Sequence, residues 1–406
     1  MDYQFNFANV SKSVTTVTSI SPVTPIAPLT SAASVALKRA KGGYIPLGTS
    51  SGSCVVLELQ TNSVLEIAES QLNEKFLKIN LGAKWLRTEF KIVDPVTGDE
   101  RRDSKALIET LLEECQALGP YQTARERGAG VWKADAGSLI INSSELFDSS
   151  GKVLTDRMHE GRIYPHTQSI GISPSTPIAT DLEVSTVLRA FDAIEWDHPL
   201  GGGLILGWLG VAVTAGALTR RPHVLLTGKA GIGKSTAISV ARNLLGELGF
   251  SAAGTPTMAS LYQGLGNTSK AAIMDEFEAN PRKPGVKDML EVFRMSYSLQ
   301  EDEQGIVRGT AGGKVRSYRF FSPCLAAGIS PPTFEPADVT RWVVLEAKSL
   351  KRDAIQLSDD DAKRIGPKLI QRIISRWDIF QSTQNTVRQK ILEQGGDGRV
   401  AETLGT

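Results

Sequence analysis

The stretch HVLLTGKAGIGKSTAISVARNLLG, residues 223–246, decides the fold. Its apolar start predicts a short buried strand, and the amphipathic segment that begins at Lys234 predicts a helix. Between them stands Gly228-x-x-x-x-Gly233-Lys234-Ser235, the pattern of a phosphate-binding loop. Glycines let the backbone fold its N–H groups around phosphate oxygens, and the N-terminus of the following helix adds its dipole. The stretch therefore predicts an α/β nucleotide-binding core.

This loop predicts a site for ATP and Mg²⁺. Lys234 is placed to contact the β- and γ-phosphates, and the hydroxyl of Ser235 is placed to bind Mg²⁺. The backbone N–H groups of the loop and of the first helical turn are expected to surround the phosphates. The expected nucleotide-binding residues are Gly228, Lys229, Ala230, Gly231, Ile232, Gly233, Lys234, Ser235 and Thr236.

A second apolar segment, KAAIMDEFEA at 270–279, ends in an acidic pair. Behind a phosphate-binding loop, such a pair is typical of nucleotide hydrolysis. Asp275 would hold the Mg²⁺ shell and Glu276 would polarise the attacking water. A small-molecule kinase needs no water-activating glutamate at this place, so the pair disfavours a kinase. Taken alone, the pair could also be a solvated acidic turn after a strand.

The stretch GIVRGTAGGKVRSYRF, residues 305–320, is glycine-rich and basic. GIVR and VRSYRF predict two paired strands, with GTAGG as the turn and Lys314 at its end. Since the loop at 228–235 already serves the phosphates, this hairpin is free to contact a nucleic-acid backbone through Lys314, Arg308 and Arg316. Two simpler interpretations stay open. Lys314, Arg316 and Arg319 could form the solvated face of an exposed hairpin, or Arg308 could pair with the acidic run 301–303.

Two further strands complete the pattern. SPCLAAGIS, residues 322–330, predicts a buried strand that ends in the polar Ser330. ADVTRWVVLEA, residues 337–347, places Arg341 immediately before another strand. Either residue could instead be an ordinary strand-end or surface residue.

The order of these segments resembles the AAA+ core and, more closely, the superfamily III helicases. GTPTMASLYQGLGN and AAIMDEFEAN, with the hairpin and the two strands after it, look like the helicase half of phage and prophage primase-helicases. This resemblance implies a ring, expected to be a hexamer, around single-stranded DNA. It also implies that Lys314 contacts DNA, that Ser330 stands at the sensor-1 position, where the family usually has Asn, and that Arg341 is an arginine finger acting on the neighbouring subunit. A primase or a replication initiator is an expected partner, but no zinc-finger or Toprim module is found, so priming is not implied.

Composition limits the alternatives. The 406 residues carry a formal net charge of +1, so contact with nucleic acid must come from a local patch. Three widely spaced cysteines argue for a reducing compartment, which by the resemblance is the cytoplasm of a bacterial host. The uncharged stretch at 199–219 is long enough to span a membrane. Its many glycines favour a buried helix, so no membrane association is expected.

The expected organisation is an α/β AAA+ core with a mixed α+β domain before it and helices after it. Residues 41–180 include a strand at 54–59, a helix at 103–119, a hairpin at 130–142 and a linker at 169–180. A helix is expected at 181–196, and two helices are expected within 358–393. The expected divisions are a disordered arm (1–40), a loading or collar domain (41–180), a helical connector (181–222), the ATPase core (223–350) and a C-terminal helical segment, expected to be truncated (351–406).

Two hypotheses of function follow from the sequence. The first is an ATP-dependent DNA helicase or translocase of phage, prophage or satellite type. The second is an AAA+ regulatory or defence ATPase that assembles on DNA or on a partner without processive unwinding. The hairpin distinguishes them, because a hairpin directed into a pore favours translocation, whereas one packed on its own domain favours the switch.

Overall fold

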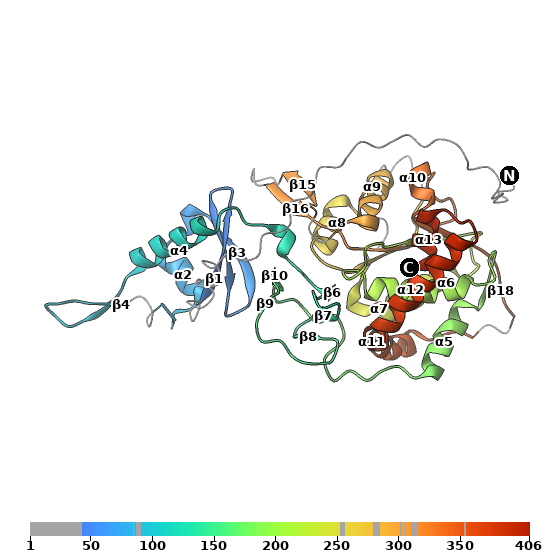
Figure 1. Cartoon of the computed structure of the whole chain (residues 1–406), viewed down its shortest axis with the longest axis horizontal. Coiled ribbons are helices and arrows are strands. Elements are labelled where there is room, and N and C mark those ends of the chain that lie inside the picture. Colours follow the sequence, from blue (N-terminus) through green and yellow to red (C-terminus); the bar gives the residue numbers. More distant parts are fainter. Residues whose placement is uncertain are drawn as a thin grey trace.

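The structure is a computed structural model of the chain (Figure 1). It describes residues 43–83, 85–86, 91–251, 256–278, 285–300, 303, 305–309, 315–352 and 355–406. The expected N-terminal arm, 1–40, lies outside these residues.

A central sheet of six strands forms the middle of the molecule, in the order β11-β18-β12-β17-β14-β13. Every neighbouring pair is parallel except β11 and β18, which are antiparallel. β12, β14 and β17 are short, apolar and almost wholly buried, as expected of parallel strands covered by helices on both faces. The strands are β11 (Ile194–Trp196), β12 (His223–Thr227), β13 (Gly249–Ser251), β14 (Ala271–Met274), β17 (Cys324–Ala327) and β18 (Trp342–Leu350).

Helices cover the two faces of this sheet, and alternate residues of a strand serve opposite faces. In β12, Val224 and Leu226 join the apolar cluster that includes α5, α6, α7 and α11, whereas Leu225 joins the cluster of α8 and α9. The helices are α5 (Asp181–Phe191), α6 (Gly201–Val213), α7 (Lys234–Leu245), α8 (Met258–Leu265), α9 (Gly285–Ser298), α10 (Pro336–Val339), α11 (Asp359–Ser375), α12 (Trp377–Glu393) and α13 (Gly398–Gly405), with a 3-10 turn, η3, at Gly246–Leu248. The two helices expected within 358–393 are thus confirmed.

The first part of the described chain forms a small unit with its own core, drawn in blue at the left of Figure 1. An antiparallel sheet, β1-β2-β3, packs against α2 and α4, and the β4–β5 hairpin follows α2. The strand expected at 54–59 and the helix expected at 103–119 are confirmed. The elements are β1 (Tyr44–Ser50), β2 (Ser53–Glu58), β3 (Ser63–Ile67), η1 (Glu69–Gln71), α2 (Glu74–Leu81), β4 (Lys91–Val93), β5 (Glu100–Arg102), α4 (Ser104–Leu118) and η2 (Thr123–Arg125).

A second small sheet, β6-β7-β8, joins the core of the central sheet. It contains the hairpin expected at 130–142, and Val131 and Ile141 lie in the same apolar cluster as Val224. Its strands are β6 (Gly130–Lys133), β7 (Leu139–Asn142) and β8 (Leu146–Asp148), followed by the pair β9 (Met158–His159) and β10 (Arg162–Ile163). Packing therefore continues across residue 180, and the domain divisions stay predictions.

Two sequence expectations are wrong. The helix expected at 181–196 ends at Phe191, because residues 194–196 pair with β18 as the edge strand β11. The linker expected at 169–180 is a packed segment, because Ile170 and Ile172 are buried in the main cluster. The apolar stretch at 199–219 contains the buried helix α6. Across the described ranges, no helix is long and apolar enough to cross a membrane.

Candidate nucleotide site and basic hairpin

The predicted phosphate loop lies between β12 and α7, as the sequence indicates. Gly228, Gly231 and Gly233 have φ values of +124°, +78° and +93°, in the region that side chains rarely adopt. A Cβ added at Gly228 would lie 2.4 Å from the carbonyl oxygen of Ala347. Glycine is therefore required for the path of this loop, which turns back tightly before the helix begins.

The buried side chain of Lys234 folds back onto the phosphate loop and binds its carbonyl oxygens. Lys234 is 7% exposed, and its Nζ donates hydrogen bonds to the carbonyl oxygens of Gly228 and Lys229, both at 2.7 Å. Gly233 stands at the N-cap of α7, and among the described residues no side chain caps this end; Ser235 and Thr236 are exposed at the first turn. Free helical N–H groups, an ammonium and exposed hydroxyls together suit a phosphate chain with a divalent cation. These residues thus fit ATP and Mg²⁺.

The acidic pair follows the last residue of β14. Asp275 is half-buried and accepts a hydrogen bond from the backbone N–H of Glu276 at 3.1 Å. Glu276 is exposed and has φ +56°, a left-handed conformation that costs a non-glycine residue about 1 kcal/mol or more. Such backbone strain is found preferentially at functional sites. It turns the chain sharply at the residue expected to activate water.

Parallel pairing brings three of the predicted segments to one edge of the sheet. β17 lies between β12 and β14 and is parallel to both, so the carboxyl ends of all three strands share an edge. The loop at 228–236 follows β12, Asp275 and Glu276 follow β14, and the exposed Ser330 follows β17. Ligands of such sheets bind outside the carboxyl ends of the strands. The structure thus gathers the predicted hydrolytic residues, except Arg341, at one edge.

Arg341 lies at the other edge of the same sheet. His223, the first residue of β12, is paired with Trp342, directly after Arg341. Arg341 is therefore level with position 222, six residues before Gly228, and at about 3.3 Å per residue it lies roughly 20 Å along the strand direction from the start of its own phosphate loop. The guanidinium lies over the ring of Tyr297, 5.4 Å from its centroid, and donates to the carbonyl oxygen of Ala337. Burial, and next the nearby positive charge of Arg399, lower the pKa of Arg341.

The predicted hairpin is present as β15 (Ile306–Gly309), paired with β16 (Val315–Tyr318) in antiparallel register. Lys314 lies outside the described residues, and Arg316 enters the pairing opposite Arg308. Arg308 is exposed and contacts its own domain, because its Nε donates to the hydroxyl of Tyr262 at 3.2 Å. Residues 301 and 302 also lie outside the described residues, so the alternative pairing of Arg308 with the acidic run stays open.

The root of this hairpin is held by a residue that sequence reasoning misassigned. Arg319 was expected on a face of the hairpin, but it is fully buried. Its guanidinium donates to the carbonyl oxygens of Ala124 at 2.7 Å, Glu303 at 3.1 Å and Gln300 at 3.3 Å. The N–H of Asn267 donates to the carbonyl oxygen of Arg319 at 2.8 Å. The hairpin is thus fixed both to the core and to the connection from the N-terminal unit. The apolar sequence after Arg319 is the one local signal of its burial.

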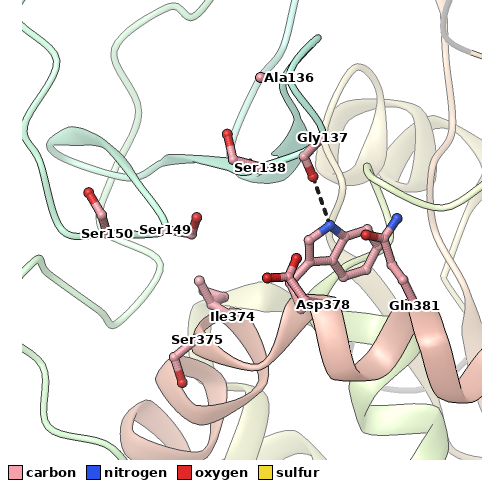
Figure 2. A pocket seen from close by; sticks show the side chains of 10 residues that line it. Ala136, Gly137, Ser138, Ser149, Ser150, Ile374, Ser375, Asp378 and Gln381 are labelled. Carbon is pink, nitrogen blue, oxygen red and sulfur yellow. Dashed lines mark hydrogen bonds between the residues drawn. The ribbon is translucent and has the colours of Figure 1, made fainter.

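A pocket of about 410 Å³ lies elsewhere, between the β6–β7 turn and the junction of α11 and α12 (Figure 2). The indole N–H of Trp377 donates to the carbonyl oxygen of Gly137 at 3.0 Å beside it. Its lining residues are Ala136, Gly137, Ser138, Ser149, Ser150, Ile374, Ser375, Trp377, Asp378 and Gln381. Since none of them belongs to the predicted site, the nucleotide site is assigned by the strand ends and not by this pocket. Within the described ranges, no group of three or more His, Cys, Asp or Glu could hold a metal ion.

No protein-family model matches the chain, and no curated protein matches it by sequence. Among solved structures, the chain is similar to the apo form of the NrS-1 C-terminal region, with 13% identity and a TM-score of 0.41 over 91% of this chain and 80% of that one. It is also similar to SCCmec type IV Cch, an active helicase, with 12% identity and a TM-score of 0.39 over 89% and 68% of the two chains. JCV helicase is 10% identical, with a TM-score of 0.28 over 56% of this chain and 52% of that one.

Proposed function

We propose that the chain is an ATP-dependent, ring-forming DNA helicase or translocase of phage, prophage or satellite replication. The observation that carries the proposal is the convergence of three loops at one edge of the sheet. They bring together Lys234, the Asp275–Glu276 pair and Ser330. A phosphate-binding loop and an acidic pair at the same edge of a parallel sheet form an arrangement suited to nucleotide hydrolysis.

Each residue has a distinct role in this proposal. Lys234 would exchange its two carbonyl partners for phosphate oxygens. The Ser235 hydroxyl and Asp275 would hold Mg²⁺, which would neutralise charge at the phosphates. Glu276 accepts a proton from the attacking water, and Ser330 donates a hydrogen bond that orients the water or the terminal phosphate. We propose that the protein acts in the cytoplasm of a bacterial host.

The position of Arg341 supports an assembly in which each nucleotide site is completed by an arginine from the neighbouring subunit. It lies at the edge of the sheet opposite its own phosphate loop, and we propose that it acts on a nucleotide across a subunit boundary. To do so, its guanidinium must leave the face of Tyr297. A closed ring, for which we propose a hexamer, supplies such a boundary at every subunit. A primase or a replication initiator would be its partner in replication.

The basic hairpin is the proposed contact with DNA. Lys314, Arg308 and Arg316 would bind phosphates of a single strand within the ring, and the buried Arg319 would pass motion between the core and the hairpin. One observation favours the second function, a regulatory or defence ATPase without unwinding. Arg308 already lies on Tyr262 of its own domain, 5.5 Å from the ring centroid.

The experiment that tests the proposal compares four proteins: the wild type, Lys234→Ala, Glu276→Gln and the matched surface control Lys363→Ala. We expect Lys234→Ala to lose binding of a fluorescent ATP analogue, because the phosphates lose their buried cation. Glu276→Gln should bind the analogue but release no phosphate from ATP. The control, exposed on α11, should behave as wild type. Equal nucleotide binding by wild type and Lys234→Ala would refute the site, and ATP hydrolysis without unwinding of a forked DNA would favour the regulatory function.

A further inference from the structure

The turn that contains Glu276 is fastened on both sides to the neighbouring strand. Before it, Met274 of β14 is paired with Ala326 of β17. After it, the backbone N–H of Phe277 donates to the carbonyl oxygen of Ala327 at 2.8 Å. The ring of Phe277 is 1% exposed and stacks on Trp342, with a centroid distance of 6.0 Å. A left-handed residue persists only where its surroundings hold it, and these contacts hold Glu276.

Glu278 connects this turn to the next loop along the same edge. Its Oε1 accepts a hydrogen bond from the backbone N–H of Ile329 at 2.7 Å, one residue before Ser330. The approach is close, because a Cβ added at Gly328 would lie 2.8 Å from the carbonyl oxygen of Phe277 and 3.2 Å from Cγ of Glu278. The N–H of Gly328 in turn donates to the carbonyl oxygen of Leu226, at the end of β12. The ends of β14, β17 and β12 are thus linked in sequence.

We propose that Glu278 is a positioning residue for ATP hydrolysis. Its side chain holds the loop of Ser330 against the turn of Glu276, so that both residues act on the same phosphate. The inference rests on the proposed function and deepens it. Glu278 acts through a hydrogen bond to a backbone N–H, which uses an acceptor oxygen and not a negative charge. Glutamine keeps that oxygen, whereas alanine removes it.

The test measures steady-state ATP hydrolysis and ATP-analogue binding for wild type, Glu278→Ala, Glu278→Gln and Gly328→Ala. Glu278→Ala should lower kcat by roughly 10- to 100-fold, the effect of a misplaced catalytic group, with the KM for ATP within about twofold of wild type. Glu278→Gln should retain most of the activity. Gly328→Ala should reproduce the loss without replacing Glu278, because its methyl group would press on the carbonyl oxygen of Phe277 and on Cγ of Glu278 and push the two loops apart. Glu291→Ala, exposed on α9, is the matched control.

The outcomes separate this inference from the function on which it rests. A wild-type chain that does not hydrolyse ATP overturns the proposed function itself. If the wild type hydrolyses ATP and Glu278→Ala has the same kcat, the positioning role is wrong and the proposed function stands. Equal losses in Glu278→Gln and Glu278→Ala would also overturn it, because the carboxylate charge would then be what matters. A melting temperature of Glu278→Ala equal to that of wild type identifies the loss of kcat as local.

Discussion

Removal of Arg294 should destabilise the protein, because it leaves the buried carboxylate of Asp338 without a positively charged partner. Arg294 of α9 binds Asp338 of α10 with both ends of its guanidinium, Nε to Oδ1 at 2.8 Å and a terminal nitrogen to Oδ2 at 2.9 Å. Asp338 is 1% exposed, whereas the Arg294 side chain is 27% exposed and also contacts Glu335. The hydrogen bond to Asp338, above all, raises the pKa of Arg294. The pair fixes α10, which ends two residues before Arg341.

Replacement of Arg294 should therefore lower the free energy of unfolding more than replacement of Asp338. Arg294→Ala leaves a buried carboxylate without its cation, which costs about 3 kcal/mol, at the lower end of the range for broken buried pairs because the arginine is partly solvated. Asp338→Asn leaves the Arg294 guanidinium, to which Glu335 and water can still hydrogen-bond, and should lower the free energy of unfolding by about 1 kcal/mol. The double variant removes the stranded charge. It should be more stable than Arg294→Ala alone by about 1–2 kcal/mol.

Urea unfolding at pH 7 and constant ionic strength, followed by tryptophan fluorescence, measures these free energies of unfolding. Trp342 belongs to the apolar cluster that Phe293, next to Arg294, also joins. Glu335→Gln is the matched control, because Glu335 is 55% exposed and its loss should change stability by less than about 0.5 kcal/mol. A double variant less stable than Arg294→Ala would refute the reasoning, since the buried charge would then not be the source of the cost.

Three further predictions concern the finger, the hairpin and pH. Arg341→Ala should bind ATP normally, and its rate of hydrolysis should fall by about 10³-fold or more. Mixing it with Glu276→Gln subunits should restore some activity at mixed interfaces. If mixing restores no activity, action on the neighbouring subunit is contradicted. Lys314→Ala should keep the basal rate of ATP hydrolysis and lose the stimulation of that rate by DNA. Its affinity for DNA should fall about equally across sequences, and the affinity should depend less steeply on salt concentration. Unwinding as fast as that of the wild type would refute the DNA contact. Burial lowers the pKa of His223 to about 3, while its ring accepts a hydrogen bond from the N–H of Cys324 at 3.0 Å. The contribution of neutral His223 to the free energy of unfolding is therefore complete above about pH 6.5 and is lost as pH falls, because only the unfolded chain takes up the proton. About 2 kcal/mol of the free energy of unfolding should be lost between pH 7 and pH 5. An equal pH dependence of stability in His223→Gln would contradict this.

The sequence predicted elements whose signals are local. The phosphate loop needs three left-handed glycines between an apolar strand and a helix, and Gly228, Gly231 and Gly233 stand at those places. The β15–β16 hairpin was predicted in the same way, from two short strands around a glycine-rich turn. Backbone preferences of this kind act within a few residues, so one sequence is enough to recognise them.

Other assignments failed because a distant segment decided them. Residues 194–196 continue a helical pattern, yet an open edge of β18 offers them strand hydrogen bonds. Arg319 follows the alternation of an exposed hairpin, yet the carbonyl oxygens of Ala124 and Gln300 surround its guanidinium. Glu278 carries no motif at all, since its partner is a backbone N–H in the loop that follows another strand, β17.

By itself, the sequence thus determined which residues can cradle phosphates and which acidic pair follows a buried strand. Only the tertiary structure decided that these residues lie at one edge of the same sheet. The order β12-β17-β14 sets Ser330 between the phosphate loop and Glu276, and the parallel register of β12 with β18 sends Arg341 to the opposite edge. The physical reason is that local dihedral preferences fix each turn, whereas strand order and direction depend on long-range pairing and on which apolar faces the helices bury together.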